Sequence, residues 1–324
     1  MNKFKNTNLA LIGNGAGLIS GITWAMNTVL IGIALTLNPL GSPYMAFFAP
    51  FLSNFLNDVF VCFWTFITLV IRGKIKQIIP SFISRNGAIL IIAGILGGPL
   101  GMLFYILGVK YSGAAYASII SSTYPVLGAI IARIFMKEKL PMKTYLGLIL
   151  IIFAVIYIGY KPGSLSAHHP DMALGLLFSF LSALGWGIQG VFLSWGMKKE
   201  TISQHMALLI TVTSSLFIDL AIILPFIGAL KFIVPVIFSH SGAVAFLAAS
   251  IGAFSTWIYY VSVHKIGPSR AMGLNITYGV WAVVLQVIFM HNHIDFRLLV
   301  AAIIIIIGVL LGSARKKELT PVMA

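Results

Sequence analysis

Residues 87–109 read GAILIIAGILGGPLGMLFYILGV, an apolar run without one charged side chain. A helix needs about 20 apolar residues to cross the hydrocarbon core of a bilayer, and this run is long enough. Working outward from it, we find similar runs along nearly all of the 324 residues, which are 59% hydrophobic and only 9% charged. A soluble domain carries about 25% charged residues. The sequence therefore predicts an all-α integral membrane protein.

Ten such runs are predicted to be transmembrane helices, because a helix satisfies its own backbone hydrogen bonds in lipid. Their expected bounds are 9–36, 44–71, 87–109, 113–136, 141–160, 172–198, 202–228, 242–264, 268–290 and 296–313. Lysine and arginine collect in cytoplasmic loops. With both termini placed in the cytoplasm, only four of the 21 basic residues fall outside, namely Lys110, Lys161, Lys231 and Arg297. We therefore expect a multi-pass protein with cytoplasmic termini.

The net charge of +14 comes mostly from these cytoplasmic loops, where anionic lipids attract basic residues. It gives no reason to expect a nucleic-acid partner. The sequence lacks a Gly-rich phosphate loop ending in Lys-Ser or Lys-Thr, so we expect no ATP hydrolysis by this chain. No pattern predicts an enzyme, a cofactor or a metal site.

The second half of the chain repeats the first with a nearly constant shift in numbering. The matched pairs include Thr123-Tyr124-Pro125 with Thr277-Tyr278-Gly279, Tyr105 with Tyr259, Trp24 with Trp186, Asn27 with Gln189, and Asp58 with Asp219. Each half holds five predicted helices, and because five is odd the halves enter the membrane from opposite sides. We therefore expect two inverted five-helix repeats, residues 1–160 and 161–324, a pattern typical of alternating-access transporters.

Two carboxyl groups lie near the middle of predicted spans, Asp58 in the second and Asp219 in the seventh. A carboxylate at that depth costs about 2.5–3.5 kcal/mol on insertion scales, so both should face the interior of the bundle. We expect one or both to bind a proton or a cation, or to set the charge of a site. The alternative is a carboxyl group that is hydrogen-bonded only for packing.

Asn27 and Gln189 follow Trp24 and Trp186 by three residues, which puts an amide and an indole on one face of each helix. An indole face with an amide can hold an organic cation or a small polar molecule. The alternative is that these side chains only hold helices together. Both tryptophans lie well inside their spans, which argues against a place at the membrane surface. We therefore expect all four residues to contact a substrate.

Other spans offer further candidates for the same cavity. The ninth carries Asn275, Tyr278 and Trp281 at intervals of three residues, on one broad helix face. The third carries Gly97-Gly98-Pro99, which should interrupt the helix, and then Tyr105, while the eighth carries Tyr259. Aromatic residues at helical spacing also occur in plain packing, so an aromatic cavity is one of two interpretations.

Ten helices, an inverted repeat and the segment Ser121-Ser122-Thr123-Tyr124-Pro125-Val126, followed by Glu138-Lys139-Leu140, resemble the drug/metabolite transporter (DMT) superfamily of the EamA type. The resemblance covers essentially the whole chain. Three segments are similar to LicB-type choline permeases: Gly98-Pro99-Leu100-Gly101-Met102, Trp186-Gly187, and Gly273-Leu274-Asn275-Ile276-Thr277-Tyr278 with Val280-Trp281.

This resemblance implies import across a bacterial plasma membrane and an aromatic cage around a quaternary ammonium, to which Trp24 and Trp281 contribute, with Tyr259 near by. One position departs from the pattern, because those permeases carry an acidic residue where Gln189 stands here. A neutral amide supplies no counter-charge for choline. Either Asp58 or Asp219 supplies it instead, or the substrate is a zwitterion or a neutral metabolite.

We therefore expect a secondary active transporter that moves a small polar metabolite, such as choline or a related amine or zwitterion, by alternating access. Proton coupling is one way to drive it, and no cofactor is expected. An exporter of amino acids or other metabolites fits the same pattern. A membrane subunit that binds a ligand without transporting it, which is a different class of function, also fits this pattern. Glycine-rich faces of the first and third spans would allow a homodimer, or tight packing within one bundle.

Overall fold

The computed structural model describes residues 2–136, 142–159, 171–197, 202–266, 274–290 and 296–313. Within them the chain forms helices joined by turns, without a strand. Six of these helices are long and apolar enough to cross a membrane: Leu11–Thr36, Ala49–Ile71, Arg85–Ser112, Met172–Leu193, Gln204–Phe226 and His240–Tyr259. Each coincides with a predicted span. Glu138-Lys139-Leu140 and Gly273, which carry part of the family resemblance, lie outside the described residues.

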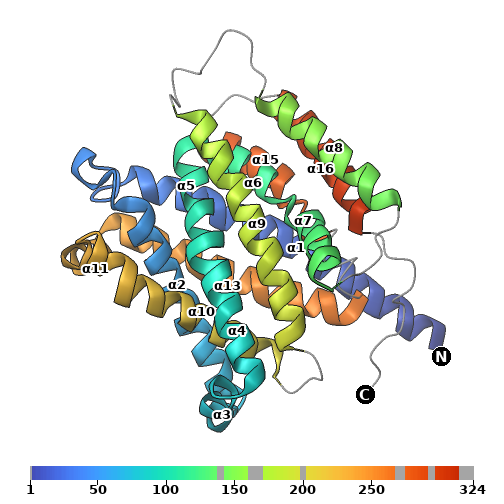
Figure 1. The fold of residues 1–324 in the computed structure, drawn as a ribbon, viewed down its shortest axis with the longest axis horizontal. Coiled ribbons are helices and arrows are strands. Elements are labelled where there is room, and N and C mark those ends of the chain that lie inside the picture. The colour runs from blue at the N-terminus through green and yellow to red at the C-terminus, as the bar shows by residue number, and fades with distance from the viewer. Residues whose placement is uncertain are drawn as a thin grey trace.

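The longer helices follow one another along the chain as in Figure 1. They are α1 (Asn2–Thr36), α2 (Ala49–Ile71), α4 (Arg85–Ile95), α5 (Leu103–Ser112), α6 (Ala114–Ser121), α7 (Tyr124–Met136), α8 (Met142–Gly159), α9 (Met172–Gly196), α10 (Gln204–Ile218), α13 (His240–Ile266), α15 (Tyr278–Met290) and α16 (Phe296–Ser313). Short elements join them: η1 (Pro43–Met45), η2 (Ile75–Gln77), α3 (Ile78–Phe82), α11 (Leu224–Phe226), η5 (Leu230–Phe232) and α12 (Ile233–Ile237). Two further segments, η3 (Leu96–Met102) and η4 (Asp219–Ile223), are π-helical.

Helices that are far apart in the sequence pack side by side. α1 lies along α13, α9 lies between α5 and α7, and α2 and α4 both pack against α10 (Figure 1). α8 and α16 pair with each other at one edge of the bundle. Because α1, α2 and α4 meet α9, α10 and α13 in this way, the two halves of the chain share one extensive interface.

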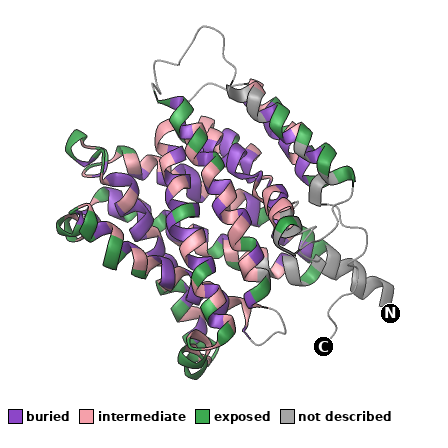
Figure 2. Ribbon diagram, in the orientation of Figure 1, coloured by how far each residue is buried: buried purple, intermediate pink, exposed green. Residues whose placement is uncertain are grey.

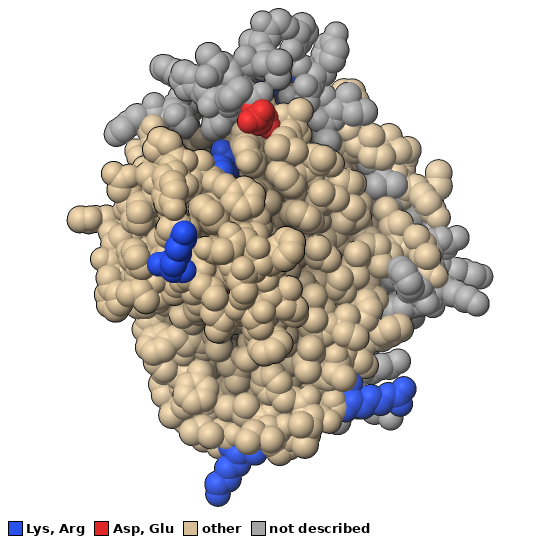
Figure 3. Space-filling model, turned by 60° about the vertical axis from the view of Figure 1, so that its left-hand side comes forward, with Lys and Arg blue, Asp and Glu red and all other residues tan. Residues whose placement is uncertain are grey.

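The surface is that of a protein surrounded by lipid. Figure 2 shows the buried residues along the helices in the middle of the bundle, with exposed residues on the outer faces and at the turns. Large apolar side chains are among the exposed ones, including Phe226, Phe238 and Ile83. On the face drawn in Figure 3, only a few charged side chains interrupt an uncharged surface. Such a surface would be unstable in water but suits a bilayer.

Two connections of the chain, one in each half, have the same conformation. Gly73 and Gly228 both adopt a left-handed backbone, with φ of 67° and 70°. Each is followed by a 3-10 turn, a five-residue helix containing a proline, and a serine whose hydroxyl accepts a backbone N–H three residues on. The serines are Ser84, which caps α4, and Ser239, before α13. A positive φ is cheap only for glycine, so these two glycines fix where the preceding helices end.

The third predicted span does not break at Gly97-Gly98-Pro99, where we expected an interruption. The helix widens there into the π-helical segment η3 and continues as α5. Proline lacks an N–H and cannot complete the α-helical pattern, and a π-turn absorbs this defect without ending the helix. The second π-helical segment, η4, begins at Asp219, directly after α10. Each π-helical segment therefore lies at a position that the sequence analysis named: η3 at Gly97-Gly98-Pro99 and η4 at Asp219.

Candidate functional site

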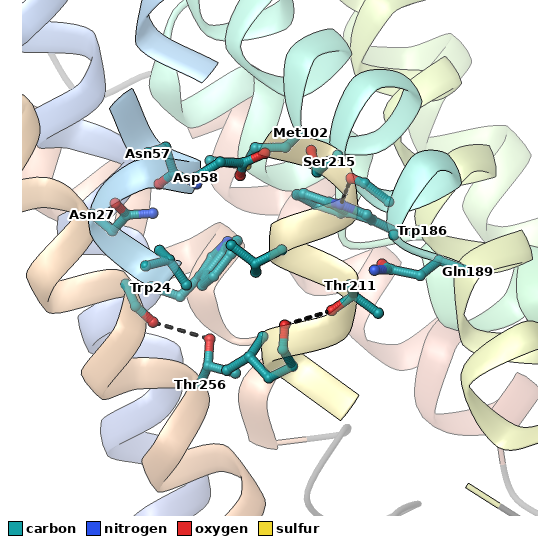
Figure 4. Close-up of a pocket in the computed structure, with 17 residues that line it drawn as sticks. Trp24, Asn27, Asn57, Asp58, Met102, Trp186, Gln189, Thr211, Ser215 and Thr256 are labelled. Atoms are coloured by element: carbon teal, nitrogen blue, oxygen red, sulfur yellow. Dashed lines mark hydrogen bonds between the residues drawn. The ribbon is translucent and has the colours of Figure 1, made fainter. Parts of the chain in front are cut away.

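A cavity of about 150 Å³ lies where the first half of the chain meets the second. Its wall comes from α1, α2 and α4–η3 of the first half and from α9, α10 and α13 of the second (Figure 4). The polar and aromatic wall residues are Trp24, Asn27, Asn57, Asp58, Trp186, Gln189, Thr211, Ser215 and Thr256. Sites for drug-sized ligands measure about 300–1,000 Å³, so this cavity suits a molecule of only a few heavy atoms.

The two predicted tryptophans form one corner of the cavity. Their ring centroids are 6.0 Å apart and the rings meet edge to face at 75°. Trp186 is held from behind by the Tyr105 ring at 5.0 Å, and its indole N–H donates to the Gly97 carbonyl at 3.2 Å. A fixed indole with an exposed face can attract a cation or pack against an apolar group.

Several buried polar atoms at this cavity lack a partner. Neither amide atom of Asn27 makes a hydrogen bond, and neither does Asp58 Oδ2 or Ser215 Oγ. All three side chains are more than nine-tenths buried. Most buried polar atoms in proteins are hydrogen-bonded, and each exception costs about 1–3 kcal/mol. A polar ligand, a proton or water in the cavity would satisfy these atoms.

Glycines make room for the wall side chains. A Cβ on Gly97 would overlap the Gln189 amide, and one on Gly101 would overlap the Trp186 indole. A Cβ on Gly98 would meet Ser215, and one on Gly252 would approach Asn27 Cγ to 3.2 Å. The GGPLG segment of η3 is therefore a flat surface on which side chains from α9 and α10 rest.

The sequence predicted nine substrate-contacting residues, and the structure brings four of them to this cavity: Trp24, Asn27, Trp186 and Gln189. Asp58 joins them, whereas Asp219 lies outside the wall and accepts a hydrogen bond from Asn54 Nδ2 at 2.6 Å.

The other five predicted residues lie outside the wall: Tyr105, Tyr259, Asn275, Tyr278 and Trp281. Tyr278 contacts Ser121 Oγ at 3.1 Å, and Asn275 Nδ2 donates to Ser20 Oγ at 2.9 Å. Trp281 packs with Tyr278 and Trp24 around Ala25, and Tyr259 is half-buried on α13. Contact between these residues and a substrate stays a prediction.

Tyr105 lies behind the cavity, fully buried, with its hydroxyl 2.6 Å from Thr28 Oγ1 and 2.9 Å from Ser118 Oγ. We expect Tyr105→Phe to lower the unfolding temperature in detergent by several degrees, because the buried Ser118 hydroxyl loses a partner at about 1–3 kcal/mol, whereas the Thr28 hydroxyl keeps its bond to the Trp24 carbonyl. Ligand affinity at the cavity should change less than about twofold. Fluorescence-monitored unfolding and a binding titration check this. A large loss of affinity with unchanged stability would instead place the hydroxyl at the ligand.

Four polar wall residues were missed by the sequence interpretation: Asn57, Thr211, Ser215 and Thr256. Two signals could have found Asn57 and Ser215, because one adjoins Asp58 and the other lies one helical turn before Asp219. Thr211 and Thr256 gave no signal, since threonines in apolar helices usually bond to their own backbone, as both do here.

Comparison with known proteins agrees with this architecture. The sequence model of the EamA-like transporter family matches residues 11–160 and 173–314. Protein LicB of Haemophilus influenzae is 29% identical over 227 residues, 70% of this chain and 75% of its own length. An uncharacterized transporter of Archaeoglobus fulgidus is 25% identical over 285 residues, 81% of this chain and 87% of its own. The uncharacterized transporter YetK of Bacillus subtilis is 22% identical over 258 residues, 78% of this chain and 76% of its own.

A solved crystal structure has the same fold, with a TM-score of 0.56 over 94% of this chain and 96% of that chain at 18% identity. The match to the family model confirms the resemblance to the EamA type of the DMT superfamily.

Proposed function

Because the chain belongs to the EamA-like transporter family, we propose that it is a secondary active transporter that carries one small polar metabolite through the cavity between its two halves. Membership of the family implies a multi-pass protein in a lipid bilayer that moves a small molecule. Alternating access, the substrate and the driving ion are the proposed parts.

The observation that carries this proposal is the convergence of unpartnered polar atoms on one cavity. Asn27, Asp58 and Ser215 bring them from three different helices, and two indoles close the corner beside them. If these residues served only to pack helices together, the arrangement would be unfavourable, because each buried polar atom without a partner destabilises the fold. A transporter tolerates the cost because the cavity is filled in part of its cycle.

The proposed architecture is ten transmembrane helices in two inverted repeats, residues 1–160 and 161–324. Two features support it. The wall is built by helices in corresponding positions of the two halves, and the connections after Gly73 and Gly228 share one conformation. We place the protein in a bacterial plasma membrane with both termini in the cytoplasm, from the distribution of lysine and arginine.

The proposed substrate is choline or a related amine or zwitterion. The volume of about 150 Å³ admits a molecule of this size. Asp58 supplies a negative charge beside two indole rings, which is the chemistry that an organic cation requires. Gln189, beside Trp186, supplies an amide to a hydroxyl or carboxylate of the substrate.

Uptake of labelled choline into proteoliposomes tests the proposal. The wild type should show saturable uptake, and Trp24→Ala should reduce it at least about tenfold, because a cation–π contact in a desolvated site is worth about 2 kcal/mol. Trp257→Ala is the matched control, since Trp257 is 42% exposed on α13 and lies outside the cavity wall. It should leave uptake unchanged.

Labelled betaine and neutral amino acids extend the same assay. If folded protein moves none of these compounds above empty vesicles, the substrate class is wrong. If both tryptophan variants lose uptake equally, the effect is on folding and the site is misplaced. Counterflow from preloaded vesicles separates a protein that only binds its ligand from one that moves it.

A further inference from the structure

The two buried carboxyl groups occupy corresponding positions on helices that pack together. Asn54 and Asp58 are four residues apart on α2, and Ser215 and Asp219 are four residues apart where α10 meets η4. Residues at this spacing share one helix face. The same shift in numbering relates Asn54 to Ser215 and Asp58 to Asp219.

Each carboxyl group faces the polar residue of the opposite helix. Asn54 Nδ2 donates to Asp219 Oδ2 at 2.6 Å, and Asp58 Oδ2 and Ser215 Oγ both lie against Gly98. The contacts run in opposite order along the two helices, as antiparallel packing requires. The bonded pair Asn54 and Asp219 and the neighbouring side chains of Asp58 and Ser215 therefore occupy equivalent places in the two halves.

The surroundings of the two carboxyl groups differ because the partners differ. The Asn54 amide is long enough to reach Asp219, and both residues are almost fully buried outside the cavity wall. Ser215 has a shorter side chain, and neither its hydroxyl nor Asp58 Oδ2 makes a hydrogen bond. Figure 4 shows Asp58 and Ser215 beside each other at the cavity. The Asp219 carboxyl group is thus held by a hydrogen bond from Asn54, whereas the Asp58 carboxyl group lines the cavity with one oxygen unbonded.

Other titratable groups near this cluster are few. Cys62 lies one turn beyond Asp58 on α2 and contacts Thr213 on α10. Arg85 of α4 and His205 of α10 lie in the first turns of their helices, α13 carries Tyr259 among its described side chains away from its ends, and Tyr105 of α5 is bound to Thr28 and Ser118.

We propose that Asn54 and Ser215 are positioning residues that decide which carboxyl group exchanges protons with the cavity. Asn54 closes off Asp219, and the shorter Ser215 leaves Asp58 open to the substrate and to water. The inference deepens the proposed function, and only its transport measurement rests on that function. Exchanging the two residues should exchange the roles of the two carboxyl groups.

Labelling with dicyclohexylcarbodiimide tests this without transport, because this apolar reagent modifies protonated carboxyl groups within membranes. Mass spectrometry of the purified protein locates the adduct. In the wild type, Asp58 should be modified several-fold more than Asp219. In the variant Asn54→Ser/Ser215→Asn, the preference should reverse. Ser215→Ala is the matched control and should leave Asp58 preferred, since it removes the hydroxyl without adding an amide. The same preference in the wild type and the exchange variant overturns the inference.

Two further measurements guard against misfolding and against a wrong function. If the exchange variant does not fold, Asn54→Ser alone should raise labelling of Asp219, and unchanged labelling contradicts the inference. In vesicles, adding Asp219→Asn to the exchange variant should reduce uptake more than adding Asp58→Asn does, the reverse of the wild-type order. Reversed labelling in a protein that transports nothing supports the inference and contradicts the proposed function.

Discussion

A Gly97→Ala variant should lose at least about tenfold in substrate uptake while keeping its fold. The new Cβ would overlap the Gln189 amide, which is the end of a flexible side chain and can move aside. Moving it removes one polar contact to a bound ligand, and about 1.4 kcal/mol, within the range of one hydrogen bond, is a factor of ten in affinity. The lost methylene-sized space also narrows a cavity of only about 150 Å³. Initial uptake rates and the ligand dissociation constant measure the effect.

Gly190→Ala is the matched control for this prediction. Gly190 follows Gln189 on α9, but a Cβ there meets no atom within 4 Å. Alanine also favours a helix over glycine by about 1 kcal/mol, so this variant should be at least as stable as the wild type and transport normally. Equal losses in both variants would show that α9 tolerates no added methyl group. Loss in neither would mean that Gln189 does not contact the ligand.

The membrane architecture could be predicted because lipid imposes one strong rule. Each helix must carry about 20 apolar residues, so runs such as 87–109 are visible without any knowledge of packing. The same rule exposes Asp58, because polar residues that lipid rejects must face the interior. Periodicity then places Trp24 with Asn27 and Trp186 with Gln189 on shared faces, and all four reach the cavity.

What periodicity could not give is the depth and direction of each side chain within the bundle. Tyr105 and Tyr278 face inward as expected, yet both hydroxyls are directed at serines of α6 rather than at the cavity. That outcome depends on the short helix α6, which begins after Gly113 with a φ of 87° and ends before Tyr124. The sequence predicted one continuous span over 113–136, but the structure divides it into α6 and α7. Without this division, the serine partners of the two tyrosines could not be predicted.

The repeat had a similar limit. It relates Asp58 to Asp219 as equivalent positions and left open whether one or both act, whereas the structure gives them different partners. The difference comes from Asn54 and Ser215, two positions whose residue types do not match between the halves. Sequence symmetry identifies equivalent places, but the chemistry at each place is decided by the neighbours that packing supplies.

Asp58→Asn should reduce uptake of a cationic substrate at least about tenfold and remove its dependence on an imposed proton gradient. Asparagine keeps the shape of the side chain, so any effect reports the lost charge and the lost proton-binding group. Removing one partner of a buried charge pair costs about 2–5 kcal/mol, which is more than the roughly 1.4 kcal/mol that makes a factor of ten. Uptake at matched internal and external pH, and again with an inward proton gradient, separates the two effects.

Asp219→Asn is the control for this experiment, because it changes the same chemistry outside the cavity wall. It should alter uptake less than Asp58→Asn does, and the response to a proton gradient should persist. If Asp58→Asn transports a cation normally and still responds to the gradient, Asp58 neither balances the charge of the substrate nor carries the proton. If it transports a zwitterion normally but fails with choline, Asp58 is the counter-charge alone, and the driving proton binds elsewhere.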